Sequence, residues 1–171
     1  MALTRINNQA LTNVTRDGLP SITSSDMPSG SVIAVKSAKD TTQYTASGTG
    51  NHASGTEMTG LSVSITPQSS SSKFYITFSG SGMIYGTSSQ DHGVIIKGGT
   101  SGTTELFRVN GYKADNTWDS ANFGGSILTS PNSTATQVYK VFYYRDGGNS
   151  QDMRINRSGG DCSLTVMEIA G

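Results

Sequence analysis

The side chains that could do acid–base or metal chemistry are few in this chain and far apart. Its two histidines, His52 and His92, each lie among Gly, Ser or Asp residues in loop-like sequence. A zinc site needs three or four ligands at close spacing, and no such set surrounds either histidine. The acids Glu57, Asp91 and Glu105 stand alone in turns, and glycoside hydrolysis needs paired carboxylates. We therefore predict a protein that is not an enzyme and that needs no cofactor or metal; a polysaccharide-active enzyme is the weakest hypothesis.

One stretch carries aromatic rings beside planar polar groups, a combination that suits saccharide stacking and bidentate hydrogen bonding. It is "ADNTWDSANF", residues 114–123, with a tyrosine two positions before it. We expect a loop there, in contact with a receptor or glycan through Tyr112, Asp115, Trp118, Asp119 and Phe123. The competing interpretation is that Trp118, the only tryptophan, fills the edge of the fold or a subunit interface. The oxygen-bearing residues are too irregularly spaced for a calcium loop.

The composition indicates an all-β protein. Charged residues make up 14% of the 171 residues, whereas soluble domains usually carry about 25%. Ser, Thr and Asn, together with 21 Gly, are interspersed with aliphatic and aromatic residues, and alternation of this kind is typical of strands. The length is sufficient for one ordinary domain with its own core.

Charge and hydropathy argue against several partners and locations. Twelve basic residues match twelve acidic ones, whereas phosphate binding needs clustered Lys and Arg, so no nucleic-acid partner is expected. No apolar run reaches the roughly 20 residues that span a bilayer, and the first residues lack the apolar core of a secretory signal. The single cysteine, Cys162, excludes an intrachain disulfide and is predicted to be a small buried hydrophobe. We expect synthesis in a bacterial-type cytosol, without membrane insertion.

From residue 31 onward, strand patterns recur at short intervals, about nine or ten in all, with no convincing helix. Residues 61–67, "LSVSITP", and residues 73–80, "KFYITFSG", alternate cleanly and are predicted to pair as a hairpin. Their predicted inward residues are Leu61, Val63, Ile65, Phe74, Ile76 and Phe78. This pattern predicts a jelly-roll-like antiparallel β-sandwich over residues 31–171.

Two of the expected strands are apolar on both faces, although a sandwich strand with one face in water should be half polar. They are "QVYKVFYYRD", residues 137–146, and "CSLTVMEI", residues 162–169. In the second, Leu164 and Val166 are assigned to the core. The other faces are predicted to pack against further copies of the chain around a symmetry axis. The predicted trimer-interface residues are Tyr139, Val141, Tyr143, Met167 and Ile169.

Residues 1–30 differ from the rest and are predicted to form an N-terminal anchoring arm. A few apolar residues sit near helical spacing, but the neighbouring asparagines lower helix propensity, and so short a helix is marginal in water. We expect an arm that becomes ordered only against a partner or against copies of itself; the alternative is a disordered leader. Its predicted anchors are Leu3, Ile6, Leu11 and Val14.

Five blocks occur along the chain in a specific order: "MALTRINNQALTNVT", "MPSGSVIAVK", "GLSVSITPQSSSSK", "SPNSTATQVYKV" and "LTVMEIAG". With these blocks the chain resembles small virion proteins of tailed phages, particularly phages that infect cyanobacteria. The resemblance covers both ends and the middle, except for about residues 80–125. It implies a trimeric β-sandwich displayed on a virion, and it transfers no catalytic residue.

Two virion roles follow from the resemblance. In the first, the protein is a tail-fibre-like appendage or adhesin on the virion surface. Its arm would bind other virion proteins, either the tail or the major capsid protein, and its distal loops would contact a host surface glycan. In the second, it is a capsid decoration protein that stabilises the shell at local three-fold sites. The two roles share fold and symmetry, so the copy number per particle separates them.

Overall fold

The computed structural model describes residues 26–47, 55–85, 90–113, 117–145 and 152–171. These residues form ten strands and one 3-10 turn. The strands are β1 (Val32–Asp40), β2 (Tyr44–Ser47), β3 (Thr56–Ile65), β4 (Lys73–Tyr85), β5 (Gln90–Gly98), β6 (Thr104–Lys113), β7 (Trp118–Thr129), β8 (Gln137–Arg145), β9 (Asp152–Ile155) and β10 (Cys162–Ile169). The 3-10 turn η3 (Arg157–Gly159) lies between β9 and β10.

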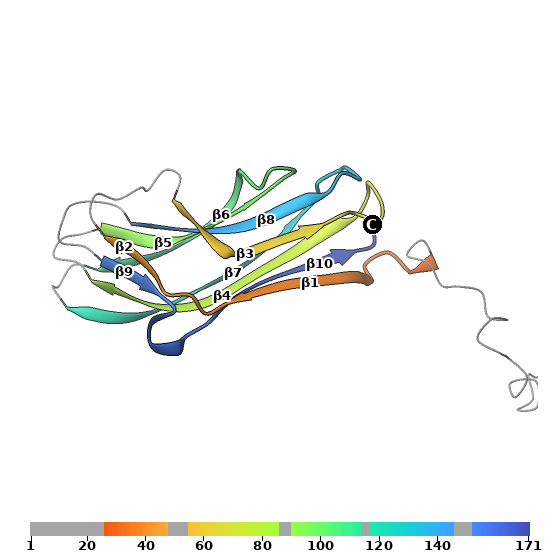
Figure 1. Ribbon diagram of the computed structural model, residues 1–171. Coiled ribbons are helices and arrows are strands. Elements are labelled where there is room, and N and C mark those ends of the chain that lie inside the picture. The colour runs from red at the N-terminus through yellow and green to blue at the C-terminus, as the bar shows by residue number, and fades with distance from the viewer. Residues whose placement is uncertain (1–25, 48–54, 86–89, 114–116, 146–151) are drawn as a thin grey trace, which may run out of the picture.

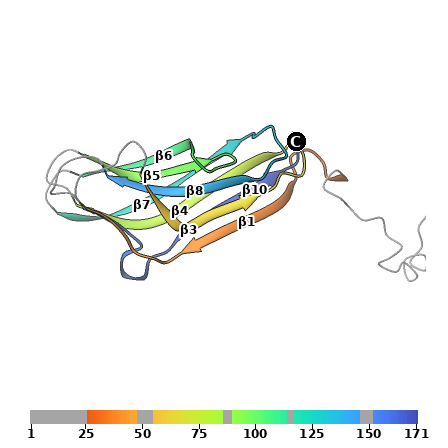
Figure 2. The ribbon, with the colours of Figure 1, turned by 45° about the horizontal axis from the view of Figure 1, so that its top comes forward.

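The strands form two antiparallel sheets that face each other (Figures 1 and 2). Sheet A has the order β1-β10-β4-β7, and β9 and β2 continue it beside the far half of β4. Sheet B has the order β3-β8-β5-β6. Neighbours in space are thus mostly distant in sequence, as in two interleaved Greek keys. The prediction of an all-β, jelly-roll-like antiparallel sandwich is confirmed.

The strand β4 is the continuous member of sheet A. It pairs with β7 along its whole length, while its other edge pairs first with β10 and then with β9. The chain leaves the sheet between β9 and β10, at residues 156–161, and also between β1 and β2, at residues 41–43. These two interruptions lie side by side, because β1 pairs with β10 and β2 pairs with β9.

One hydrophobic core lies between the sheets. The inward residues predicted for residues 61–67 and 73–80 are all buried, none of them more than 3% exposed. Leu164 and Val166 are fully buried, as predicted. Burial of a large aliphatic or aromatic side chain stabilises a fold by about 1.5–3 kcal/mol. The alternation read from these strands therefore identifies much of what holds the two sheets together.

The predicted hairpin is wrong. The strand β3 pairs with β8 in sheet B, whereas β4 pairs with β10 and β7 in sheet A. The connection between them crosses from one sheet to the other. Both strands present one apolar face to the same core. Apolar and polar residues alternate in the same way whether two strands pair within one sheet or lie in opposite sheets. The sequence pattern could not distinguish the two arrangements.

The strand β8 turns inward the face that was predicted to meet another subunit. Tyr139 is 2% exposed and Val141 is fully buried within the core, so their assignment to a trimer interface is wrong. Tyr143 also packs against this core. On the other face, the Lys97 ammonium lies 4.1 Å from the centre of the Phe142 ring, and such a cation covers an aromatic face. The inner face of β8 is therefore buried in the core, and Lys97 covers part of its outer face.

Main-chain hydrogen bonds tie the residues before β1 to those after β10. The Gly30 N–H donates to the Ala170 carbonyl at 2.8 Å, and the Ala170 N–H donates to the Ser31 carbonyl at 2.8 Å. The predicted anchors Leu3, Ile6, Leu11 and Val14 lie outside the described residues. Within the part of the chain that is described, no helix is long and apolar enough to cross a membrane.

Candidate functional site

The outer face of sheet A carries a row of apolar side chains across four strands. Strand register aligns Val35 with Met167, Met167 with Tyr75, and Tyr75 with Leu128. Val35 is 57% exposed, Leu128 52% and Tyr75 37%. We call these four residues the apolar row. Contiguous apolar surface of this kind is a feature of protein contact sites, whereas single exposed apolar residues need no explanation.

The surroundings of the apolar row differ on its two sides. Toward the chain ends, Ile169 pairs with Val32, which is 50% exposed. Met167 and Ile169 thus lie on the outer side of β10, opposite the core residues of that strand. Two residues away in the other direction lies a row of hydroxyls: Ser37, Thr165, Thr77 and Ser126. The outer face of sheet A therefore changes from apolar to polar over two residues along each strand.

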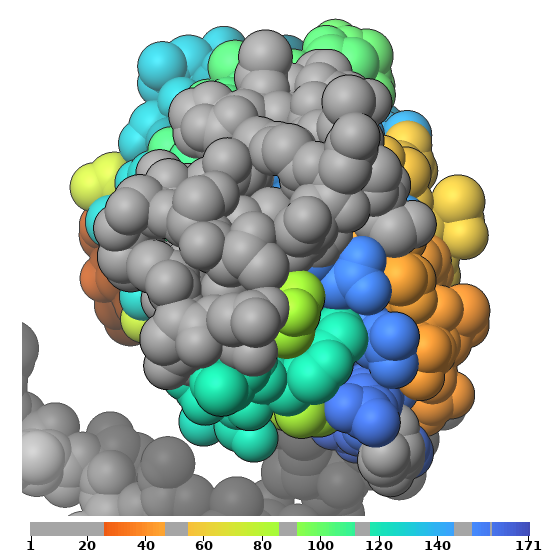
Figure 3. All heavy atoms as spheres, turned by 90° about the vertical axis from the view of Figure 1, so that its left-hand side faces the viewer, coloured from red at the N-terminus to blue at the C-terminus, as the bar shows by residue number. Residues whose placement is uncertain are grey.

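At the other end of the same face, an indole and two guanidinium groups gather. The Trp118 ring lies across the β7–β4 pair from Tyr85, with ring centroids 5.3 Å apart. The Arg154 guanidinium lies 4.6 Å from the indole centroid, and the Arg157 guanidinium lies 5.7 Å from it. Aromatic faces attract cations at such distances. Figure 3 looks onto this end, where β7 (teal), β4 (yellow-green), β9 (blue) and β2 (orange) follow one another.

Beside this cluster a shallow trough follows β4 and β7. Its floor consists of small residues in register, Ser79 opposite Gly124 and Ser81 opposite Asn122. The segment around η3 forms its wall, since a Cβ added at Gly160 would lie only 2.7 Å from the Ser81 Oγ. Two cavities of about 290 and 260 Å³ share Ser81 and Asn122. Each volume is slightly below the range for small-molecule sites, about 300–1,000 Å³.

Only part of the predicted glycan contact lies at this trough. Trp118 begins β7 instead of lying in a loop, and Asp119 belongs to the opposite face because side chains alternate along a strand. Phe123 is 2% exposed within the core, so its assignment to a glycan contact is wrong. Tyr112 lies in β6 of sheet B. Asp115 lies outside the described residues.

Sequence reasoning missed the two arginines of the cluster. They occur in "DMRINRS", which was read as one further strand. In a continuous strand, residues three apart would point to opposite faces. Asn156 interrupts the strand with a left-handed backbone (φ 57°), and Arg154 and Arg157 therefore reach the same indole. The asparagine was the available signal, since Asn adopts this conformation more readily than most residues.

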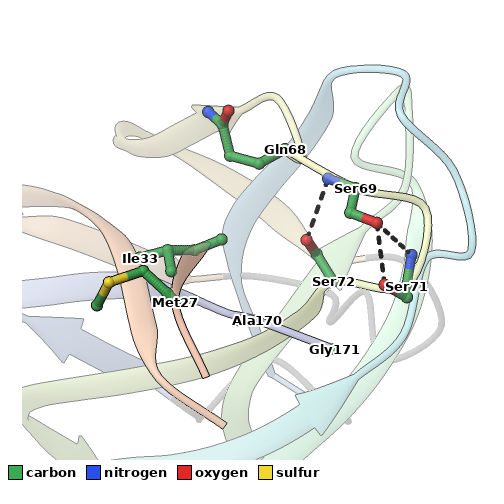
Figure 4. A pocket seen from close by; sticks show the side chains of 8 residues that line it. All are labelled: Met27, Ile33, Gln68, Ser69, Ser71, Ser72, Ala170 and Gly171. Atoms are coloured by element: carbon green, nitrogen blue, oxygen red, sulfur yellow. Dashed lines mark hydrogen bonds between the residues drawn. The ribbon is translucent and has the colours of Figure 1, made fainter. Parts of the chain in front are cut away.

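A third cavity, of about 270 Å³, lies where the residues before β1 meet the C-terminal residues (Figure 4). Met27 and Ile33 line one part of it, and the serine-rich connection before β4 lines another. Nearby, Glu168 is fully buried, and its Oε1 accepts from the Gln68 N–H at 2.6 Å and from the Ser72 hydroxyl at 2.7 Å. These bonds fix the serine-rich connection against the last strand beside the cavity.

Polar groups are buried together where sheet A is interrupted. The Asn156 Nδ2 donates to the Asp40 and Thr42 carbonyls, both at 3.0 Å, and its Oδ1 accepts from the Cys162 thiol at 2.8 Å. The Asp40 carboxylate accepts from the Tyr44 hydroxyl at 2.5 Å and from the Thr42 N–H at 2.8 Å. The hydrogen-bond partner of the Cys162 thiol is thus an amide oxygen, which is not a general base that would activate a nucleophile. This polar cluster joins β1 and β2 to β9 and β10.

Hydrogen bonds control the protonation of Asp40. Burial alone would raise its pKa, but bonds from the Tyr44 hydroxyl and the Thr42 backbone outweigh burial and lower the pKa below the ordinary value of 3.8. A carboxyl with a lowered folded pKa stabilises the fold above its unfolded pKa, and the contribution is lost as pH falls through the folded pKa. We expect Asp40→Asn to lower the free energy of unfolding by about 1–2 kcal/mol at pH 7, and by less in acid. Urea unfolding at pH 7 and in acid measures both; an equal loss at each pH would contradict this.

Cys162 is 1% exposed, as its prediction as a small buried hydrophobe requires. Burial raises the pKa of its thiol to about 11, and the thiolate is the reactive form. We expect an aromatic disulfide reagent at pH 8 to label the native protein at least about a hundredfold more slowly than the urea-unfolded protein. Absorbance at the released thiolate follows the reaction. Rapid labelling of native protein would show that the polar cluster opens without unfolding.

His92 lies in β5 and is fully buried, although its flanking residues had suggested a loop. It pairs in register with Arg145 of β8. Among the described residues, no group of three or more His, Cys, Asp or Glu side chains is placed to hold a metal ion. The apolar row and the trough make the outer face of sheet A the candidate functional surface of the described residues.

Comparison with known proteins gives distant structural likenesses. No protein-family model matches this chain, and no curated protein matches it. A chain in the structure of infectious bursal disease virus, Gx strain, is similar at 17% identity and a TM-score of 0.44, covering 82% of this chain and 33% of that chain. A chain of the Gt strain is 12% identical with a TM-score of 0.37, and the match covers 81% of this chain and 38% of that chain. A mutant VP2 protein of this virus, in derived T=1 particles, is 16% identical with a TM-score of 0.34, and the match covers 80% of this chain and 36% of that chain.

This chain thus spans about a third of the length of these structural neighbours. Likeness at this level identifies neither a family nor a function.

Proposed function

We propose that this chain is a non-enzymatic structural protein of a tailed-phage virion, a tail-fibre-like appendage or adhesin that assembles as a homotrimer. The observation that carries the proposal is the apolar row, which leaves contiguous apolar side chains exposed on the outer face of sheet A. Covering that row with further copies of the chain would remove it from water. The ordered sequence blocks that resemble small virion proteins of tailed phages, particularly cyanobacterial ones, support the same role.

Each part of the chain has a role in this proposal. The apolar row, with Ile169 beside it, packs against neighbouring copies. The arm attaches the trimer to the tail or to the major capsid protein through Leu3, Ile6, Leu11 and Val14. The far end of sheet A, with Trp118, faces the host surface and contacts a glycan there. The assembly is displayed on the virion surface after synthesis in the host bacterial cytoplasm, and it binds no nucleic acid and inserts into no membrane.

A quantitative gel of purified virions tests the role. An appendage or adhesin predicts tens of copies per particle or fewer, whereas a decoration protein at local three-fold sites predicts hundreds. Hundreds of copies per particle would contradict the appendage role and support the decoration role, which uses the same fold. Absence of the chain from washed particles would defeat both.

Removing residues 1–28 is expected to leave a folded, trimeric body that no longer joins particles. The truncation spares the hydrogen bonds that Gly30 and Ser31 make with Ala170, so β1 keeps its attachment to the last strand. Melting temperature and light scattering check the body, and particle assembly with the truncated gene checks attachment. Normal incorporation of the truncated protein would place attachment in the sandwich.

A further inference from the structure

We propose that the trough on sheet A binds an acidic saccharide, with Arg157 as the contact to its negative group. This inference rests on the proposed function, because it gives the chemistry of the host-facing contact. It concerns the floor residues of β4 and β7 and the wall formed around η3.

Arg157 is the charged group of the wall that lacks an acidic partner among the described residues. Its Nη1 donates to the Met83 Sδ at 2.8 Å, and a thioether is a weak acceptor that carries no charge. By contrast, Arg154 lies 3.8 Å from the Asp152 carboxylate, and Lys39 is paired with Asp161 at the far end of the trough. The side chain of Arg157 is exposed and lines the cavity. Its positive charge is therefore held in place and not neutralised.

The floor beneath Arg157 offers neutral hydrogen-bonding groups. Ser120 and Asn122 lie on the outer face of β7, and Ser81 lies opposite Asn122 on β4. An amide has both donors and acceptors, and each hydroxyl can donate or accept. Neighbouring sugar hydroxyls need such mixed partners. A guanidinium binds a carboxylate or a sulfate through parallel hydrogen bonds. Together these groups match a sugar ring that carries one negative substituent.

Other occupants fit less well. A nucleic acid requires several phosphate contacts, whereas the trough has, among the described residues, one uncompensated arginine, and the lysine at its far end, Lys39, is already paired with Asp161. A protein partner usually supplies apolar anchors to a dry centre. Of the apolar residues that line the trough, Met83 is occupied by Arg157 and Phe123 is buried in the core, and the rest of the floor is serine, asparagine and glycine. The apolar row lies at the other end of the face, where Leu128 and Tyr75 pair. The two ends of sheet A therefore suit different partners.

Titration of the full-length protein with short galacturonic acid oligomers tests the inference, with NMR chemical shifts as the readout. Galactose oligomers of equal length are the neutral control, and sulfated galactose oligomers separate sulfate from carboxylate. We expect the neutral oligomer to bind at least about tenfold more weakly than an acidic one. Arg157→Gln should weaken acidic binding at least about tenfold without changing the melting temperature. Lys73→Gln makes the same charge change on the same face outside the trough, and should bind like the wild type.

The inference is supported if the protein prefers an acidic oligomer and this preference disappears in Arg157→Gln but persists in Lys73→Gln. The acidic oligomer that binds more tightly then identifies the preferred anion, carboxylate or sulfate. Equal binding of acidic and neutral oligomers overturns it, as does a preference that Arg157→Gln retains. Absence of binding to all three oligomers also overturns it. These outcomes are independent of the particle experiment: loss of sugar binding defeats this inference alone, whereas absence of the chain from virions defeats the proposed function.

Discussion

Replacing Asn156 by alanine is expected to lower the free energy of unfolding by about 3–5 kcal/mol. The side chain is 2% exposed and donates to two main-chain carbonyls, those of Asp40 and Thr42. The Asp40 carbonyl accepts a buried hydrogen bond, and the loss of its donor costs about 1–3 kcal/mol. The bond to the Thr42 carbonyl is only part-buried, so its loss costs less. Alanine would also have to keep the left-handed backbone of this position, φ 57°, at about 1–2 kcal/mol. Since whole domains are stable by only about 5–15 kcal/mol, urea unfolding should detect the loss easily.

Asn132→Ala is the matched control for the backbone part of this loss. Asn132 has a similar left-handed backbone conformation, φ 51°, but it is an exposed residue. Its replacement should therefore cost about 1–2 kcal/mol, the backbone part alone. Asn156→Gly relieves the backbone strain and retains the loss of hydrogen bonds, so it should fall between the two. Equal costs for Asn156→Ala and Asn132→Ala would mean that the buried hydrogen bonds contribute nothing measurable.

The inward faces of the sandwich strands were predictable because their signal is local. In residues 61–67 and 73–80, every second side chain is apolar, and a period of two assigns faces without knowledge of the neighbouring strands. Leu164 and Val166 were placed in the core on the same ground, and both are fully buried. Pairing partners were not predictable in this way, since a jelly roll joins strands far apart in sequence. The predicted hairpin failed for this reason.

Residues of the candidate surface were predicted only where the periodicity of a single strand was sufficient to assign them to a face. Met167 and Ile169 were correctly placed opposite the core face of β10. The assignment of Tyr139 and Val141 failed because an apolar pattern on both faces of β8 shows that both are covered, without showing which face meets the core. Lys97, from another strand, covers Phe142. The apolar row and the trough each combine residues from several strands, so they emerge only from the register.

Changing Leu128 to aspartate is expected to abolish self-association while each subunit remains folded. Leu128 is 52% exposed in the single chain, so an aspartate there stays hydrated in the monomer. In an assembly that covers the apolar row, the same charge would lose water without gaining a partner, at a cost of several kcal/mol in each copy. Light scattering at micromolar concentration should change from trimer to monomer. Urea unfolding of the same samples should show each subunit still folded.

Two variants separate the contribution of the apolar row from that of charge and of core packing. Ser126→Asp places the same charge two residues along β7, on the same outer face but in the hydroxyl row, and should leave the trimer intact. Val166→Ala removes core methyl groups and should cost about 1–3 kcal/mol within each subunit without dissociating it. If Ser126→Asp dissociates the trimer as readily as Leu128→Asp, the contact covers the whole face. If the wild type is itself a stable monomer at this concentration, the apolar row has another occupant, and the homotrimer is excluded.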